Sequence, residues 1–151
     1  MEWMTLSGQP TDVSEFLDKY SEKDWKLYIG TDSQSTGSRH RNFATVLVAW
    51  KEGTGAYAIQ RRSKSENIRT LHDQLMQETW LSIEQAQLIQ ELVDDKKITI
   101  HMDVNQNTRY DSGKFQNELV GFVKGLGYDY ALKPNAWVAS GVADRKVRNN
   151  D

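Results

Sequence analysis

Apolar and polar residues along the chain predict three strands, followed by helices and strands in alternation. The first three apolar runs have strand character and cover residues 25–32 (WKLYIGTD), 42–50 (NFATVLVAW) and 56–62 (AYAIQRR). Turns containing Gly or Ser separate them, and such short connections favour an antiparallel meander. Apolar residues then recur at helical spacing from about residue 68 to residue 93, which predicts one long helix.

The second half of the chain continues this alternation. Residues 97–103 (KITIHMD) read as a strand, 114–126 as a helix ended by Gly127, 128–133 as a strand closed by Pro134, and about 136–147 as a last helix. The order βββαβαβα predicts an α/β fold. We expect a five-stranded mixed sheet, antiparallel among its first three strands and parallel thereafter, with helices flanking it.

The N-terminal segment predicts a short helix over residues 11–20 (TDVSEFLDKY), with a threonine cap and apolar residues at helical spacing. We therefore divide the chain into an N-terminal helical extension, residues 1–24, and one main domain, residues 25–151. The extension is expected to lie at the periphery.

Composition narrows the class of protein. The chain has 151 residues, of which 38% are apolar and 26% charged, and it contains no cysteine. Disulfides, thiolate metal sites and cysteine nucleophiles are thereby excluded. No stretch approaches the length of a membrane span, so we expect a cytoplasmic protein without a membrane partner. The oligomeric state is left open.

Charge is unevenly distributed along the chain. Between Arg39 and Arg69 there are seven Lys or Arg and two Glu, an excess of five, whereas residues 73–95 carry six acids and no Lys or Arg. Ordinary solvated faces explain most such runs, and a phosphate-binding side is the alternative.

Two aspartates end predicted strands. Asp32 follows the apolar run LYIGT, and Asp103 closes ITIHM. In open α/β sheets ligands gather at the carboxyl ends of parallel strands, so both residues lie where a site is expected. Taken singly, each could be a turn residue, with Asp103 capping the turn VNQN.

Two further acids lie on predicted helices. Glu78 falls near the middle of the apolar arc of the long helix, whereas Glu84 lies on its margin. A helix that began after Glu78 would leave this residue in solvent. On the last helix, Asp144 follows the small residues of ASG by one turn, although an ion pair with Arg148 would also explain it.

Together, the four acids point to metal chemistry. Mg²⁺ and Mn²⁺ are bound through oxygen, usually by a few carboxylates with water and substrate phosphate. Two such ions about 3.5–4 Å apart can activate a water and stabilise the leaving oxygen in phosphodiester cleavage. Four convergent carboxylates would hold such a pair.

The chain resembles the ribonuclease H-like superfamily, and more narrowly the YkuK-type family of predicted ribonuclease H-related nucleases. The segments that carry the resemblance are YIGTDSQS, LMQETWLSIEQAQ, ITIHMDVN and ALKPNAWVASGVADRKV. It covers residues 25–148 and implies the five-stranded fold described above. The resemblance implies that Asp32, Glu78, Asp103 and Asp144 bind metal and act in catalysis, with Glu84 as the alternative helix acid.

Four other residues are candidates for contact with substrate. Ser33 and Gln34 would contact a nucleic-acid backbone or form the turn. His101 would share a face with Asp103 and tune it or move a proton, or else be a structural histidine. Lys133 would contact phosphate at the end of the fifth strand, or be an ordinary surface lysine.

Our first hypothesis is a nuclease dependent on Mg²⁺ or Mn²⁺, with two ions bound together with substrate. Its substrate would be RNA, an RNA–DNA hybrid or structured DNA. The second hypothesis is an inactive or weakly active nucleic-acid-binding module on the same fold. The third is half of an actin-like ATPase, which the chain length argues against.

Overall fold

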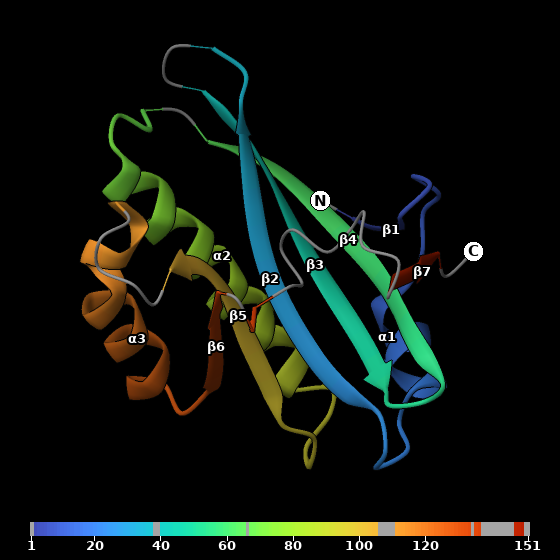
Figure 1. Cartoon of the computed structure of the whole chain (residues 1–151). Coiled ribbons are helices and arrows are strands. Elements are labelled where there is room, and N and C mark those ends of the chain that lie inside the picture. The colour runs from blue at the N-terminus through green and yellow to red at the C-terminus, as the bar shows by residue number, and fades with distance from the viewer. Residues whose placement is uncertain are drawn as a thin grey trace.

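The computed structural model describes residues 2–37, 40–65, 67–105, 111–133, 135–136 and 147–149. It contains strands, α-helices and one 3₁₀ segment, η1 (Figure 1). In chain order these are β1 (Trp3–Thr5), α1 (Val13–Lys19), β2 (Lys26–Ser35), β3 (Arg41–Lys51), β4 (Gly55–Ser65), α2 (Leu71–Gln90), β5 (Ile98–Asn105), η1 (Asp111–Phe115), α3 (Gln116–Gly125), β6 (Asp129–Lys133) and β7 (Val147–Asn149).

The strands form one mixed sheet in the order β1-β4-β3-β2-β5-β6, with β7 also paired to β4. β2, β3 and β4 are antiparallel neighbours, and β2, β5 and β6 are parallel ones. The predicted five-stranded mixed sheet is therefore confirmed as the β4-β3-β2-β5-β6 part. Two short strands that the apolar pattern did not indicate, β1 and β7, extend it along the outer edge of β4.

The N-terminal segment is less peripheral than expected. β1 pairs with β4 in antiparallel register, Trp3 opposite Arg61. Phe16 and Leu17 of α1 are 2% and 3% exposed and belong to the main core cluster. The extension thus contributes a strand as well as a helix, and both bury apolar surface against the sheet. The domain division at residue 25 stays a prediction.

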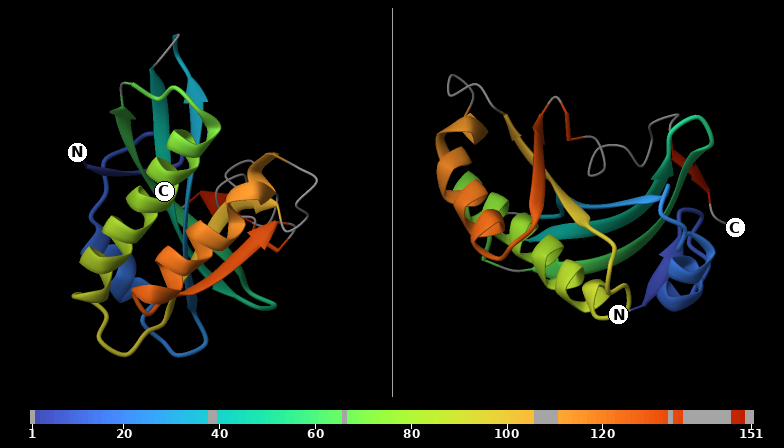
Figure 2. Two further views of the ribbon diagram at one scale, coloured as in Figure 1. Left: turned by 90° about the vertical axis from the view of Figure 1, so that its left-hand side faces the viewer. Right: turned by 90° about the horizontal axis from the view of Figure 1, so that it is seen from below.

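Helix α2 determines which face of the sheet is covered. Its cap residue Thr70 accepts a hydrogen bond from the backbone N–H of Asp73. The apolar side of the helix buries Leu75, Ile83 and Ile89 in the same core cluster as the α2-facing residues of β2 and β5. α3 lies beside α2 on this face of the sheet (Figure 2). The chain leaves α3 through Gly127, whose φ of 88° is the left-handed conformation that glycine favours.

The predicted last helix, 136–147, falls almost entirely outside the described residues. Its final residue, Val147, begins strand β7 instead, so the helix does not extend that far. Among the described residues, no helix is both long enough and apolar enough to cross a membrane.

Candidate functional site

Asp32 and Asp103 lie side by side on neighbouring parallel strands. β2 and β5 pair in register up to Gly30 opposite His101, and two residues further along each strand stands an aspartate. Side chains two apart on a strand share a face, so both carboxylates lie on the face of the sheet away from α2. Both residues are inside their strands, which reach Ser35 and Asn105. The alternative interpretation of each as a turn residue is therefore wrong.

Glu78 reaches the same strand ends from α2, on the opposite face. The Ser82 hydroxyl pairs with that of Thr31 at 2.8 Å, and the Ser33 hydroxyl donates to Oε2 of Glu78 at 2.5 Å. Four helical residues rise about 6 Å and two strand residues about 6.7 Å, so both pairs form in register. This match places Glu78 at the site, 4% exposed, and leaves Glu84 exposed to solvent. The alternative in which the helix began after Glu78 is wrong, because α2 begins at residue 71.

A polar network holds the Glu78 carboxylate. Arg41 donates through Nε to the Ser33 hydroxyl at 2.9 Å and through Nη2 to the Ser33 carbonyl at 3.1 Å. Gln74 donates to Oε2 of Glu78 at 3.1 Å. The other oxygen, Oε1, is buried and has no hydrogen-bond partner in the described part of the chain. Hydrogen bonds thus hold Oε2 of Glu78 in place, while Oε1 remains without a partner in this network.

Burial and mutual repulsion raise the pKa values of Glu78 and Asp32. The pKa of Glu78 rises to about 7, chiefly because the carboxyl is buried; hydrogen bonds from Ser33 and Gln74 oppose the shift, and the charges of Asp32 and Asp103 add to it. Burial likewise raises the pKa of Asp32, with Asp103 adding to that shift. The three acids are therefore electrostatically coupled, and a cation among them would relieve the repulsion.

Lys133, at the end of β6, forms an ion pair with Oδ1 of Asp103. Its side chain is 43% exposed, so the ammonium reaches the site from solvent. The structure places Lys133 beside Asp103, while its contact with phosphate stays a prediction. A cation thus already lies against one of the aspartates.

His101 packs on Tyr28, with ring centroids 4.7 Å apart, and is 4% exposed. Burial lowers its pKa to about 4, so the ring is neutral at pH 7. A neutral, buried ring supports the structural interpretation of His101 over a proton-transfer role.

The remaining predicted residues have different outcomes. Ser33 is 8% exposed and its hydroxyl is engaged within the protein, so it positions Glu78 rather than presenting a contact for nucleic acid. Gln34 is exposed beside Asp32 and is free to meet a ligand from solvent. Asp144 lies outside the described residues.

Sequence reasoning missed Arg41 and Gln74 as members of the site. Arg41 pairs with Ser35 across the β2–β3 hairpin, which makes Ser33 its diagonal neighbour on the same face. Gln74 precedes Glu78 by four residues on one helix, a spacing at which side chains meet. The second signal was readable from the sequence, while the first required the strand register.

The donor chemistry of the site fits Mg²⁺ or Mn²⁺, because it combines three coupled carboxylates with the buried Oε1 of Glu78, which has no hydrogen-bond partner among the described residues. Glu78 and Asp103 also line one small cavity of about 10 Å³, close to the space that a single water needs. Among the described residues, no three His, Asp or Glu side chains lie close enough together to hold one metal ion. Glu78 approaches from the α2 face of the sheet and the two aspartates from the opposite face, which explains why the three side chains lie apart.

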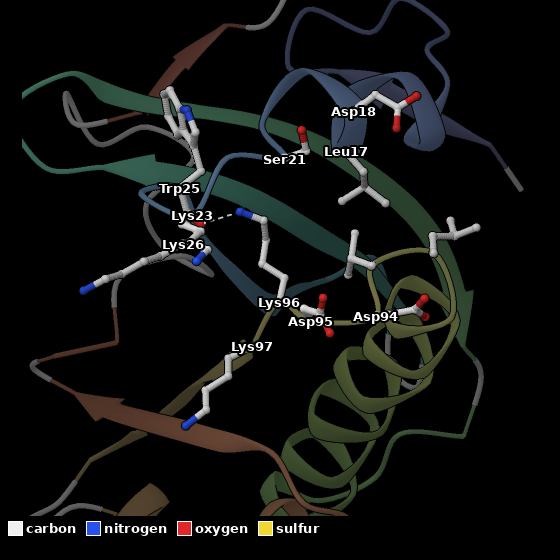
Figure 3. A pocket seen from close by; sticks show the side chains of 12 residues that line it. Leu17, Asp18, Ser21, Lys23, Trp25, Lys26, Asp94, Asp95, Lys96 and Lys97 are labelled. Atoms are coloured by element: carbon white, nitrogen blue, oxygen red, sulfur yellow. Dashed lines mark hydrogen bonds between the residues drawn. The ribbon is translucent and has the colours of Figure 1, made fainter.

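A second cavity, of about 480 Å³, lies at the other end of β2 and β5, between α1 and the end of α2 (Figure 3). Lys96 crosses it and donates to the backbone carbonyls of Glu22 and Trp25 at 2.5 and 2.8 Å. These bonds tie the segment before β2 to the segment before β5. The cavity therefore lies where several elements meet, at the opposite end of the strands from Asp32 and Asp103.

Comparisons with known proteins bear on the family of the chain. No curated protein matches the chain closely enough to count as a relative. A solved structure of the foamy viral protease-reverse transcriptase in complex with dsDNA is 13% identical, covers 85% of this chain and 80% of that chain, and has a TM-score of 0.34, too low to carry an argument. The model of one family, described as Ribonuclease H-like, matches residues 10–148. The chain therefore belongs to the ribonuclease H-like family.

Proposed function

We propose that this protein is a divalent-metal-dependent nuclease that hydrolyses phosphodiester bonds in RNA, an RNA–DNA hybrid or structured DNA. Its family supports a nucleic-acid-related function of nuclease type. The observation that carries the proposal is the coupled group of Asp32, Asp103 and Glu78, in which Oε1 of Glu78 is buried and has no partner within the described residues. A buried acceptor without a donor costs about 1–3 kcal/mol, which a bound cation would offset.

Each residue has a role in this proposal. Asp32 and Asp103 would hold the metal from one face of the sheet, and Glu78 would complete its ligands through Oε1. Ser33, Arg41 and Gln74 keep Oε2 of Glu78 in place. Asp144 is proposed as the fourth ligand from its sequence match alone. When bound, Mg²⁺ or Mn²⁺, two ions with substrate, would supply an activated water and stabilise the leaving oxygen.

A nucleic-acid-binding module without activity is the second candidate, because Lys133 already neutralises Asp103. A site with a built-in ammonium binds a divalent ion less tightly than one without it. Binding to nucleic acid would then remain while hydrolysis was lost.

The test is cleavage of labelled RNA, RNA–DNA hybrid, single-stranded DNA and branched DNA in Mg²⁺ or Mn²⁺. Asp32→Asn and Asp103→Asn should each abolish cleavage, and Glu84→Gln, which removes an exposed carboxylate, should leave it unchanged. Calorimetric titration of Mn²⁺ into the same proteins gives a readout apart from activity. Cleavage that survives both aspartate substitutions would overturn the proposal, and binding without cleavage in the unaltered protein would favour the module.

A further inference from the structure

A polar, positively charged grid lies on the same face of the sheet as Asp32. Directly paired residues on neighbouring strands point to one face, so the register of β2, β3 and β4 defines rows of side chains across the sheet. The two rows are Asp32–Ala44–Arg62 and Gln34–Asn42–Lys64. Asp32 is the only acid in either row.

The grid is open to solvent, unlike the part of the same face that lies further along β3. Gln34, Asn42, Arg62 and Lys64 are exposed and Ala44 is half-buried. Further along β3 on the same face, Val46 is fully buried. The uncovered surface therefore begins level with Asp32 and continues along the hairpin that projects past α2 (Figure 1).

The two cations of the grid are not paired with any acid that the structure describes. Neither Arg62 nor Lys64 forms an ion pair in the described part of the chain. Among the described residues, Arg62 makes a long hydrogen bond of 3.4 Å from its Nε to Oε1 of Gln60, on the same face of β4. Both charges therefore remain available to a ligand from solvent.

We infer that this grid is a track for the backbone of one nucleic-acid strand, with Arg62 and Lys64 binding its phosphates beside the carboxylate site. Arg, Lys, Asn and Gln are the side chains that contact phosphate and sugar oxygens. No aromatic residue lies in the two rows, so bases would not stack there, and the track would read the backbone and not the sequence. This inference rests on the proposed function and deepens it.

Spacing agrees with the inference. Two strand-to-strand steps separate Asp32 from Arg62, about 10 Å, which corresponds to the axial rise of about three nucleotides of one strand. The small side chain of Ala44 between them leaves the surface flat, so a backbone can pass without obstruction. Arg62 would thus hold a phosphate a few nucleotides from the bond at Asp32.

The experiment measures binding in an Asp32→Asn background, which should block cleavage and lower the repulsion of phosphate. Labelled single-stranded RNA, single-stranded DNA and RNA–DNA hybrid are titrated by fluorescence anisotropy at several salt concentrations. Arg62→Ala and Lys64→Ala should each weaken binding about 5- to 10-fold. Each should also reduce the salt slope by about 0.7 on a single strand and about 0.9 on a duplex.

Arg61→Ala is the matched control, since it removes the same charge from the neighbouring residue of β4, which faces the other side of the sheet. It should change binding less than twofold. Equal losses for Arg61→Ala and Arg62→Ala, or full binding by the Arg62→Ala/Lys64→Ala double variant, would overturn the track. If the unaltered protein cleaves nothing while the double variant still loses binding, the track stands and the nuclease proposal fails. If the unaltered protein cleaves, and the double variant cleaves with the same KM, the track fails and the nuclease proposal stands.

Discussion

The two ends of the parallel strands β2 and β5 hold charged side chains in different ways. At the amino end, the half-buried Lys96 donates hydrogen bonds to two backbone carbonyls and so joins two segments of the chain. At the carboxyl end, Glu78 is held through one oxygen while the other has no partner in the described part of the chain. A polar group whose hydrogen bonds are made stabilises the fold, whereas a buried group that lacks one needs another explanation, such as a ligand.

The largest effect expected from this contrast is on activity. Glu78→Gln removes a proposed ligand but keeps the shape of the side chain. Cleavage should fall at least about 100-fold, the upper end of the loss seen even for residues that only support metal ligands. Initial rates at saturating Mn²⁺ measure it. Glu84→Gln is the control on the same helix, and equal rates for Glu78→Gln and the unaltered protein would remove Glu78 from the site.

The second effect is on the pH dependence of stability. Because the folded state holds the Glu78 proton with a pKa of about 7, against 4.5 unperturbed, its contribution to stability is full below pH 4.5 and is lost as pH rises through 7. The unaltered protein should therefore lose up to about 3 kcal/mol relative to Glu78→Gln between pH 4 and pH 8. Urea unfolding at both pH values measures the difference, and parallel pH profiles for the two proteins would contradict it.

The third effect concerns the amino end of the strands. Lys96→Met keeps the length of the side chain but leaves two carbonyls without their donor, at a cost of about 1–3 kcal/mol. The free energy of unfolding should fall by that amount, while the rate of cleavage by the folded protein stays the same. Lys97→Met, an exposed neighbour at the same cavity, should change stability by less than about 0.5 kcal/mol. A selective loss of activity in Lys96→Met would break the contrast between the two ends.

The smallest effect is at Lys133. Removing its ammonium in Lys133→Met frees Asp103, so Mn²⁺ should bind more tightly. Because the lysine is 43% exposed and its attraction is screened, the gain should be at most about fivefold, or 1 kcal/mol. Calorimetric titration of Mn²⁺ measures it. Weaker Mn²⁺ binding in this variant would mean that Lys133 supports the metal site and does not compete with it.

Local patterns in the sequence determined the fold class. Period-two and helical spacing indicated the five main strands, α1, α2 and α3, because burying one face of each element imposes that spacing. They did not indicate β1 or β7, since strands of three residues are too short to show a period. The pairing of such edge strands depends on which backbone edge the rest of the fold leaves open.

The same division holds for the site. The sequence determined that Asp32 and Asp103 follow runs of apolar residues and that Glu78 lies among apolar helix positions. The resemblance implied that all three bind metal. Only the tertiary structure decided that Glu78 and not Glu84 meets β2, because that choice depends on the match between helical rise and strand rise at Ser33. It also decided that Arg62 shares a face with Asp32, since residues thirty apart become neighbours only through strand register.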